Sequence, residues 1–239
     1  MMEASLISKK KDGLCIARVF TKPDEDPLLT QEYEMRSSAI TEPDGKVVFE
    51  LKNLEIPKGW SQLATDIVAS KYFRKAGVPQ TGSENSVKQV VKRISNSIAK
   101  IGEAYGYFAA GEDAENFQAE LAHLLITQKA AFNSPVWFNV GLFHEYGING
   151  SGGNYYFDLD KNNTVQSANA YEHPQCSACF IQSVNDDLMS IFDLVKSEAR
   201  LFKYGSGSGT NFSALRSHFE HLAGGGTSSG VMAFLVVLD

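Results

Sequence analysis

Residues 179–211, CFIQSVNDDLMSIFDLVKSEARLFKYGSGSGTN, decide how this chain is expected to fold. The segment Cys179-Phe180-Ile181 predicts a short strand, and Asp186 or Asp187 can cap the helix that follows, because short acidic side chains accept hydrogen bonds from free backbone amides. A glycine-rich loop from Gly205 to Gly209 comes next. Strand, helix and glycine loop in this order indicate an α/β arrangement. Apolar residues expected to face inward from the helix are Leu188, Ile191, Phe192, Val195, Ala199 and Phe202.

Upstream of this stretch, the sequence predicts a helical region that follows a small β-rich extension. Residues 13–20 and 47–51 are expected as strands, because turn-forming Pro, Asp and Gly separate them. Ser61 can cap a helix that ends before Gly77, and apolar spacing predicts a longer amphipathic helix from Val87 to Phe108. Asp113 is expected to cap a third helix. The apolar stripes of these helices are interpreted as core.

The pattern changes after Ala131. Asn133-Ser134-Pro135 interrupts the helical pattern, Val136-Trp137-Phe138 resembles a strand, and residues 144–175 are expected to form a long irregular insertion. These changes predict three regions: a β-rich extension at 1–55, a helical region at 56–130 and an α/β region at 131–239. The apolar run 231–238, which Ser228-Ser229 can cap, suggests a chain cut short; a docked final helix is the alternative.

Composition excludes several classes of protein. The 239 residues include 22 basic and 28 acidic side chains, so the net charge of -6 argues against a broad nucleic-acid surface. The single basic run, Lys9-Lys10-Lys11, is expected to be a solvated tail. No segment approaches the roughly 20 apolar residues that span a bilayer, and no signal-peptide core is present. Three cysteines are too few for a disulfide scaffold, which favours a cytoplasmic protein.

Two motifs could carry chemistry, but each is ambiguous by itself. The glycine loop can present backbone amides to an anion, although it lacks the ending of a P-loop and follows a helix rather than a strand. Cys176-Ser177-Ala178-Cys179 has the spacing of a redox pair or of half a zinc site, for which His173, His218 and His221 are the candidate further ligands. Cys179 could equally be a small buried side chain, as is expected of Cys15.

The order of several motifs is more specific than any one of them. In chain order these motifs are WSQLATDIVASKYF at 60–73, AAFNSPVWFNVG at 130–141, PQCSACFI at 174–181, FKYGSGSGTN at 202–211 and GGGTSSG at 224–230. Together they resemble the adenosylcobalamin-dependent (class II) ribonucleotide reductases across nearly the whole chain. The first fifty residues match this family less distinctively.

The resemblance implies a ten-stranded α/β barrel behind an amino-terminal helical region, incomplete in this chain. It also implies that a thiyl radical removes the ribose 3′ hydrogen, and that a cysteine pair then becomes a disulfide as the 2′ hydroxyl leaves as water. By position, Cys179 resembles the first cysteine of that pair. Ser134, Ala178, Cys179 and Gly207 match positions that contact substrate, whereas Asp186, Leu188 and Arg216 match positions that read a deoxynucleotide effector. Cys179 is expected to end a strand, with the effector residues beside it.

The resemblance further implies partners and a cofactor that lie mostly outside this chain. They are adenosylcobalamin, a ribonucleoside di- or triphosphate substrate, a deoxynucleotide effector, a thioredoxin-type reductant and the carboxy-terminal part of the reductase; a homodimer is a further option. No cysteine follows Cys179, so the radical cysteine and the second redox cysteine are missing and the chain alone is expected to be inactive. Alternatives are a class I large-subunit fragment, a non-catalytic nucleotide-binding module and a zinc-binding domain.

Overall fold

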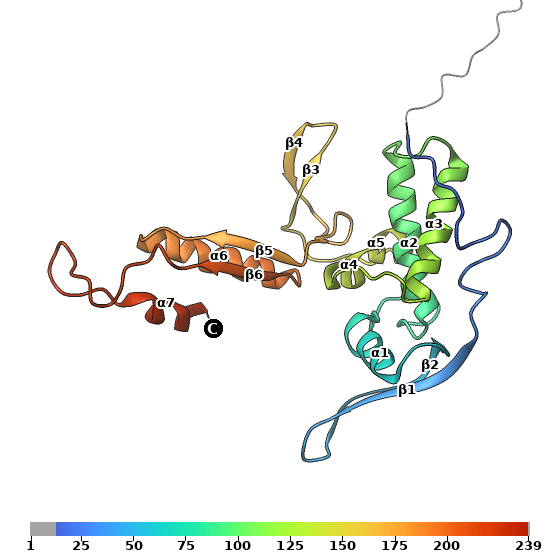
Figure 1. Cartoon of the computed structure of the whole chain (residues 1–239), viewed down its shortest axis with the longest axis horizontal. Coiled ribbons are helices and arrows are strands. Elements are labelled where there is room, and N and C mark those ends of the chain that lie inside the picture. The colour runs from blue at the N-terminus through green and yellow to red at the C-terminus, as the bar shows by residue number, and fades with distance from the viewer. Residues whose placement is uncertain (1–12, 239) are drawn as a thin grey trace, which may run out of the picture. The chain divides into compact units, whose positions relative to one another are not determined.

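The computed structural model describes residues 13–238, so the basic run at 9–11 lies outside the described residues. Contacts divide the chain into two compact units. The first runs to Phe132 and continues from Val136 to Pro174, and the second contains Asn133–Pro135 and the residues from Gln175 onward. Figure 1 shows the elements of each unit. Among the described residues, no helix combines the length and the apolar character that crossing a bilayer requires.

The first unit begins with an extension that is not a strand, contrary to the expectation for residues 13–20. Apart from an isolated bridge between Leu14 and Phe108, its backbone bonds side chains of a helix instead of a neighbouring strand. The Ile16 amide donates to Asp113 Oδ1 at 2.7 Å, and the Thr21 amide donates to Glu120 Oε1 at 2.9 Å. Cys15 is therefore exposed, and its predicted burial was wrong.

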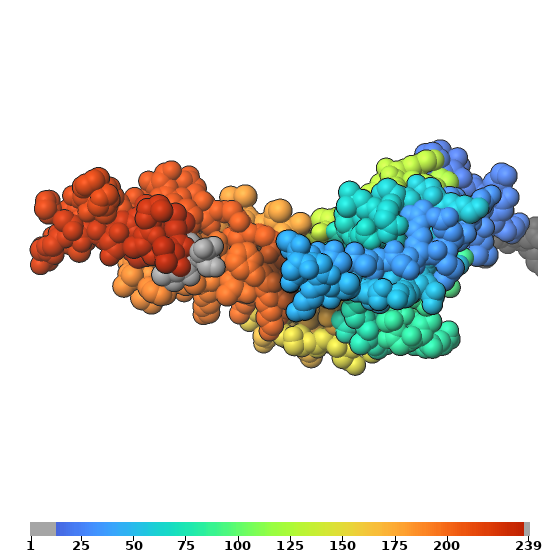
Figure 2. Space-filling model, turned by 90° about the horizontal axis from the view of Figure 1, so that it is seen from below, coloured from blue at the N-terminus to red at the C-terminus, as the bar shows by residue number. Residues whose placement is uncertain are grey.

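A long antiparallel hairpin follows the extension. Strand β1 (Tyr33–Thr41) was not foreseen, whereas β2 (Val47–Pro57) confirms and lengthens the strand predicted at 47–51. Figure 2 shows the surface of the hairpin in light blue beside that of helix α1 in cyan. Helix α1 (Gln62–Ile67) begins at its predicted cap, because Ser61 Oγ accepts from the Ala64 amide at 3.0 Å. The π-helix η1 (Val68–Tyr72) continues it.

Two longer helices lie side by side (Figure 1). Helix α2 (Val87–Ala104) confirms the predicted amphipathic helix, which stops short of Phe108. Helix α3 (Gly111–Ile126) starts earlier than expected: Asp113 is its third residue rather than its cap, and Asp113 Oδ2 accepts from the Ala110 amide at 3.0 Å. An acidic side chain at this position still stabilises the helix start, because it satisfies a free amide there.

The segment expected as a strand at 136–138 is helical. Helix α4 (Ser134–Asn139) carries Pro135 in its first turn, where the missing amide of proline costs no hydrogen bond. The insertion that was expected to be irregular also contains regular elements. These are helix α5 (Leu142–Tyr146) and the antiparallel hairpin of β3 (Tyr155–Asp158) and β4 (Asn163–Gln166).

A buried ion pair organises this region of the first unit. Arg93 Nε lies 2.7 Å from Glu84 Oε1, and the two side chains are 1% and 0% exposed. The guanidinium also donates to the carbonyls of Val140 at 2.5 Å and Trp137 at 2.7 Å. The last carbonyls of a helix accept no hydrogen bond from the helix itself. Arg93 donates to two such carbonyls at the carboxyl end of α4.

The second unit is built on a parallel strand–helix–strand motif, whose first strand and helix were predicted, whereas its second strand begins inside the segment expected as a glycine loop. Strand β5 (Cys179–Ser183) pairs with β6 (Gly207–Asn211), and helix α6 (Leu188–Lys203) connects them (Figure 1). Asp187 caps α6 through Oδ2, which accepts from the Ser190 amide at 2.9 Å. The glycine loop is shorter than expected, because Gly207 and Gly209 belong to β6. Helix α7 (Gly230–Leu238) follows, and Ser228 Oγ accepts from the Gly230 amide.

The inward face of α6 was only partly predicted. Ile191 is buried, but Leu188, Phe192, Ala199 and Phe202 are exposed. Glu198 occupies the buried face instead, where its carboxylate accepts from Ser208 Oγ at 2.9 Å. A hydrogen-bonded carboxylate can be buried where an unpaired one cannot, so Glu198 shares the buried face of α6 with Ile191 and Leu194. The core residues of the unit are Val184, Ile191, Leu194 and Leu215.

The described residues contain three two-stranded sheets, and none of them closes on itself. Only β5 and β6 are parallel, with a helix as their connection, which is the building unit of an α/β barrel. The chain thus combines helices and strands and contains an incomplete barrel. This confirms the predicted fold class. The three-region division at 1–55, 56–130 and 131–239 stays a prediction.

Candidate functional site

Three of the four predicted substrate-contacting residues meet at the start of the parallel strands. Cys179 and Gly207 are register partners, each at the first position of its strand. The Gly207 amide donates to the Ala178 carbonyl at 2.6 Å. Cys179 therefore begins β5, and the expectation that it ends a strand was wrong.

The side chain of Cys179 lies on the exposed face of this strand pair. Side chains alternate between the two faces of a strand, and in β5 Cys179 and Ile181 are exposed while Phe180 and Gln182 are half-buried. The opposite face packs on α6, where Ser208 bonds Glu198. On the exposed face, the neighbouring positions of β6 are Gly207 and Gly209. Because these residues have no side chains, the surface beside the Cys179 thiol is open.

A polar cross-link holds together the two segments that precede β5 and β6. Ser206 Oγ donates to the Ser177 carbonyl at 2.7 Å, and the Gln175 amide group donates to the same carbonyl at 2.9 Å. Gln175 also donates to Ser206 Oγ at 2.7 Å. Sequence reasoning did not single out Gln175 or Ser206, although both lie inside motifs that carry the family resemblance. They fix the backbone on either side of Ala178 and Gly207.

The two neighbouring cysteines have different environments. Neither cysteine forms a disulfide within the described residues. Cys179 is exposed whereas Cys176 is half-buried, and burial raises the pKa of the Cys176 thiol. Since the thiolate is the reactive form, a raised pKa makes Cys176 the poorer nucleophile. The zinc alternative gains no support, because residues 13–238 contain no cluster of three or more His, Cys, Asp and Glu side chains that could hold a metal.

Ser134, the fourth predicted substrate contact, is the first residue of α4. By its contacts, the segment Asn133–Pro135 groups with the compact unit that contains Cys179. A segment some forty residues upstream of Cys179 is thus part of the same unit. Its role in binding remains a prediction.

Two of the three predicted effector residues form an ion pair. Arg216 Nε lies 2.5 Å from Asp186 Oδ2, and the Arg216 amide donates to Asp186 Oδ1 at 3.2 Å. The hydrogen bond from the Arg216 side chain lowers the pKa of the Asp186 carboxyl. Leu188, the first residue of α6, is 57% exposed. All three residues lie beyond the carboxyl end of β5.

The predicted effector residues are therefore not beside Cys179, contrary to the expectation from the sequence. Cys179 is at the amino end of β5 and Asp186 follows its carboxyl end, at Ser183. Four residue steps along a parallel strand span about 13 Å. The predicted substrate and effector positions thus lie at opposite ends of one strand pair, and β5 connects them.

Comparisons with known proteins agree with these features. A family model described as class II vitamin B12-dependent ribonucleotide reductase matches residues 34–128, and a model of the ribonucleotide reductase barrel domain matches residues 177–239. Together the two models match well over half of the chain. The first covers α1 to α3, and the second starts just before Cys179.

Curated relatives support the same assignment. A vitamin B12-dependent ribonucleotide reductase of Agrobacterium fabrum is 45% identical over 260 residues, which cover 94% of this chain and 20% of the relative. One from Rhodopirellula baltica is 47% identical, with 91% and 21% covered. A ribonucleoside-diphosphate reductase subunit alpha of Helicobacter pylori is 39% identical, but over 32% of this chain and 10% of that protein.

The chain therefore spans about a fifth of the length of the vitamin B12-dependent relatives it matches. The matches to vitamin B12-dependent enzymes extend over nearly all of it, whereas the match to the alpha subunit is confined to a third. This difference favours the cobalamin class over the class I alternative. The chain belongs to the vitamin B12-dependent, class II family of ribonucleotide reductases.

Proposed function

We propose that this chain supplies one redox cysteine, part of the substrate site and part of the effector site of a ribonucleotide reductase that converts ribonucleotides to 2′-deoxyribonucleotides. The observation that carries the proposal is the exposed Cys179 thiol, held in register with Gly207 on an open face of a parallel strand pair. The family membership of the chain gives this arrangement its chemical meaning.

In the proposed reaction, Cys179 is one of two thiols that reduce the ribose. The two thiols release two electrons and two protons and become a disulfide, while the C2′–O bond breaks, a C2′–H bond forms and water leaves. The second thiol must come from outside this chain, because Cys176 is half-buried and no cysteine follows Cys179. A thioredoxin-type dithiol would then reduce the disulfide for the next turnover.

Small residues around Cys179 suit a site into which a sugar must fit. Gly207 has no side chain, and Ala178 has only a methyl group. The hydrogen bond between the Gly207 amide and the Ala178 carbonyl keeps the two strand ends together while substrate is bound. We assign Ser134 a hydroxyl contact with the nucleotide.

The Asp186–Arg216 pair supports the proposed effector site. Asp186 holds Nε of Arg216, which fixes the plane of the guanidinium, and this planar fork matches the geometry of phosphate oxygens. Leu188 offers exposed apolar surface beside it for a base or sugar. An effector bound here would act on Cys179 through β5, which is the physical basis of the proposed allosteric control. A second copy of the chain could complete this site.

Adenosylcobalamin, which the family implies, is too large for either of two cavities within residues 13–238. These cavities measure about 380 and 420 Å³, at the small end of the range for ligand sites, and a corrin macrocycle with its side chains needs more room. The corrin is therefore assigned to the remainder of the enzyme. A cytoplasmic location and a role in deoxyribonucleotide supply for DNA replication complete the proposal.

Complementation tests the function. The 239-residue chain is mixed with a polypeptide that supplies the remaining four-fifths of a vitamin B12-dependent relative, and deoxynucleotide formation is measured with adenosylcobalamin and a dithiol. We expect turnover from the mixture and none from the chain alone. Cys179→Ser should abolish turnover, while Cys15→Ser, which also removes an exposed thiol, should leave it unchanged.

Two results would contradict this proposal. Turnover by the 239-residue chain alone would show that the missing cysteines are not needed. Full turnover by the Cys179→Ser mixture would exclude this thiol as a member of the redox pair. Deoxynucleotide binding without any effect of Cys179→Ser on turnover would favour the non-catalytic nucleotide-binding module.

A further inference from the structure

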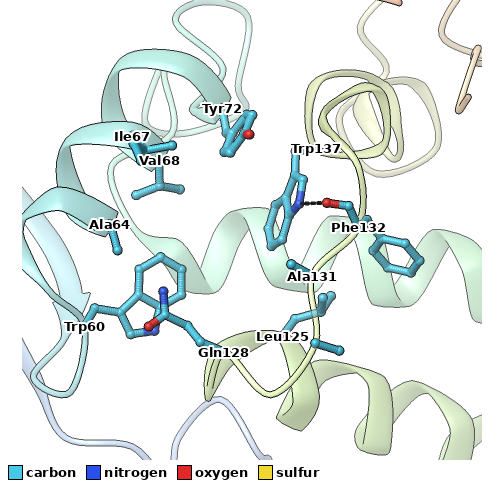
Figure 3. Close-up of a pocket in the computed structure, with 11 residues that line it drawn as sticks. Trp60, Ala64, Ile67, Val68, Tyr72, Leu125, Gln128, Ala131, Phe132 and Trp137 are labelled. Atoms are coloured by element: carbon cyan, nitrogen blue, oxygen red, sulfur yellow. Dashed lines mark hydrogen bonds between the residues drawn. The ribbon is translucent and has the colours of Figure 1, made fainter. Parts of the chain in front are cut away.

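The first unit contains an apolar cavity that the proposed reaction does not use. Its volume is about 380 Å³, within the range of small-molecule sites. Figure 3 shows its walls: Trp60, Ala64 and Val68 on one side, and Trp137 with Tyr72 on the other. Two indoles on opposite sides of one cavity are well placed to hold a flat ring, because aromatic faces stack on heteroaromatic rings.

The polar atoms of both indoles are already engaged inside the protein. Trp60 Nε1 donates to the Ile126 carbonyl at 2.8 Å, and Trp137 Nε1 donates to the Phe132 carbonyl at 3.0 Å, the dashed line in Figure 3. These bonds fix the two rings and leave only their carbon faces toward the cavity. Tyr72 stacks on Trp137 with 5.8 Å between ring centroids, which holds that wall further.

Gln128 brings a carboxamide to the edge of this cavity, and its backbone is unusual. Its φ is 56°, a left-handed backbone conformation that residues other than Gly and Asn rarely adopt. The position follows the end of α3, where glycine would be the unstrained residue. Within residues 13–238 its amide group makes no hydrogen bond. A strained glutamine with a free carboxamide beside an aromatic cavity points to a bound partner.

We propose that this cavity binds the adenine ring of a nucleoside or nucleotide, stacked between Trp60 and Trp137, with the Gln128 carboxamide on its hydrogen-bonding edge. A glutamine carboxamide pairs with adenine through one donated and one accepted bond, at N7 and N6. A purine with an oxygen at position 6 offers two acceptors there, so one of the two bonds is lost. The site is lined by residues of the first unit alone and does not depend on the proposed reduction.

The two tryptophans make the test direct, because they are the chain's only ones and both line the cavity. Adenosine is titrated into the 239-residue chain while tryptophan fluorescence is followed. We expect saturable quenching, and inosine should bind roughly tenfold more weakly because it loses one edge bond. Ala64→Phe, which fills the cavity with a ring, should abolish the quenching while the far-ultraviolet circular dichroism spectrum is retained.

Gln128→Gly separates a binding role from a structural one. It relieves the left-handed strain, so the thermal midpoint should stay the same or rise. Adenosine binding should nevertheless weaken roughly tenfold and the preference over inosine should disappear. The matched control is Gln80→Gly: Gln80 is also left-handed, with φ of 68°, but does not line the cavity, and its replacement should leave binding unchanged.

Two adenine-bearing sources are distinguished by further probes in equilibrium dialysis. ATP that binds more tightly than adenosine identifies a nucleotide, whereas adenosylcobalamin that binds more tightly than cyanocobalamin identifies the adenosyl group of the cofactor. Either result supports the adenine site. Absence of saturable quenching by adenosine, quenching that persists in Ala64→Phe, or a preference for adenosine that survives in Gln128→Gly would overturn it. None of these failures would affect the assignment of Cys179.

Discussion

Replacing Arg93 by methionine tests the buried ion pair that organises the first unit. Methionine has a comparable length and keeps the apolar packing, so the change removes mainly the charge and its donors. It leaves the Glu84 carboxylate, 0% exposed, without its cation. The carboxylate would retain two donors, the Arg74 amide at 2.7 Å and the Tyr146 hydroxyl at 2.9 Å. Two neutral donors do not offset the burial of a full charge.

The expected cost follows from this geometry. Breaking a buried pair by removing one partner costs about 3–5 kcal/mol, because an uncompensated charge remains in the interior. The Val140 and Trp137 carbonyls also lose the donors that Arg93 supplies at 2.5 and 2.7 Å. We therefore expect the upper half of that range.

Urea unfolding followed by tryptophan fluorescence measures this cost. Trp60 and Trp137 both belong to the first unit, so the signal reports on that unit. With an m value of about 2 kcal/mol per molar urea, the midpoint should fall by about 2 M. Adding Glu84→Gln should recover part of the loss, since it removes the stranded charge and keeps a carbonyl acceptor for Tyr146.

A matched surface pair provides the control. Lys58 Nζ lies 2.8 Å from Glu32 Oε2, but the side chains are 55% and 80% exposed. Lys58→Met should leave the midpoint nearly unchanged, because solvent screens such pairs. A loss below about 1 kcal/mol for Arg93→Met, no more than an ordinary hydrogen bond contributes, would refute the reasoning. The reasoning would also be refuted if the double variant, Arg93→Met with Glu84→Gln, had the same urea midpoint as Arg93→Met alone.

Two further predictions concern backbone geometry and pH. A Cβ at Gly141 would lie 2.5 Å from the Arg93 carbonyl oxygen, whereas one at Gly147 meets nothing within 4 Å, although both have positive φ. Gly147→Ala should cost about 1 kcal/mol from conformation alone, and Gly141→Ala several times more in the same urea assay; equal costs would contradict this. The lowered pKa of Asp186 predicts that its ion pair with Arg216 persists above the usual value of 3.8 and breaks as pH falls through the lower folded value. In an NMR titration, Arg216→Met should return that pKa toward 3.8, and an unchanged value would show that Arg216 is not the cause.

Local sequence signals predicted the elements whose stabilisation is local. Ser61 and Asp187 are helix caps where their positions before an apolar repeat indicated. The strand at Cys179 and the helix after it also follow from a pattern within some twenty residues. Such features depend on neighbours in the chain, which is why one sequence suffices to predict them.

Expectations failed where distant residues decide the structure. Residues 13–20 looked like a strand, but side chains of α3 about a hundred residues away take their hydrogen bonds. The apolar stripe of α6 predicted its buried face, yet Glu198 faces inward because Ser208 lies opposite it. The segment 136–138 is β-branched and aromatic, but it forms part of a helix whose carboxyl end binds Arg93.

The candidate site shows the same division. The sequence by itself determined the family, through the order of its motifs, and indicated the candidate site residues: Cys179, Ala178, Gly207 and the pair Asp186 and Arg216. Only the tertiary structure decided that the Cys179 side chain shares the open face with Gly207, and that the predicted effector residues lie beyond the far end of β5. The order of motifs can be seen directly in the sequence. The register of two strands, and the face on which a side chain lies, depend on which strands pair, and pairing brings together residues that are distant in the sequence.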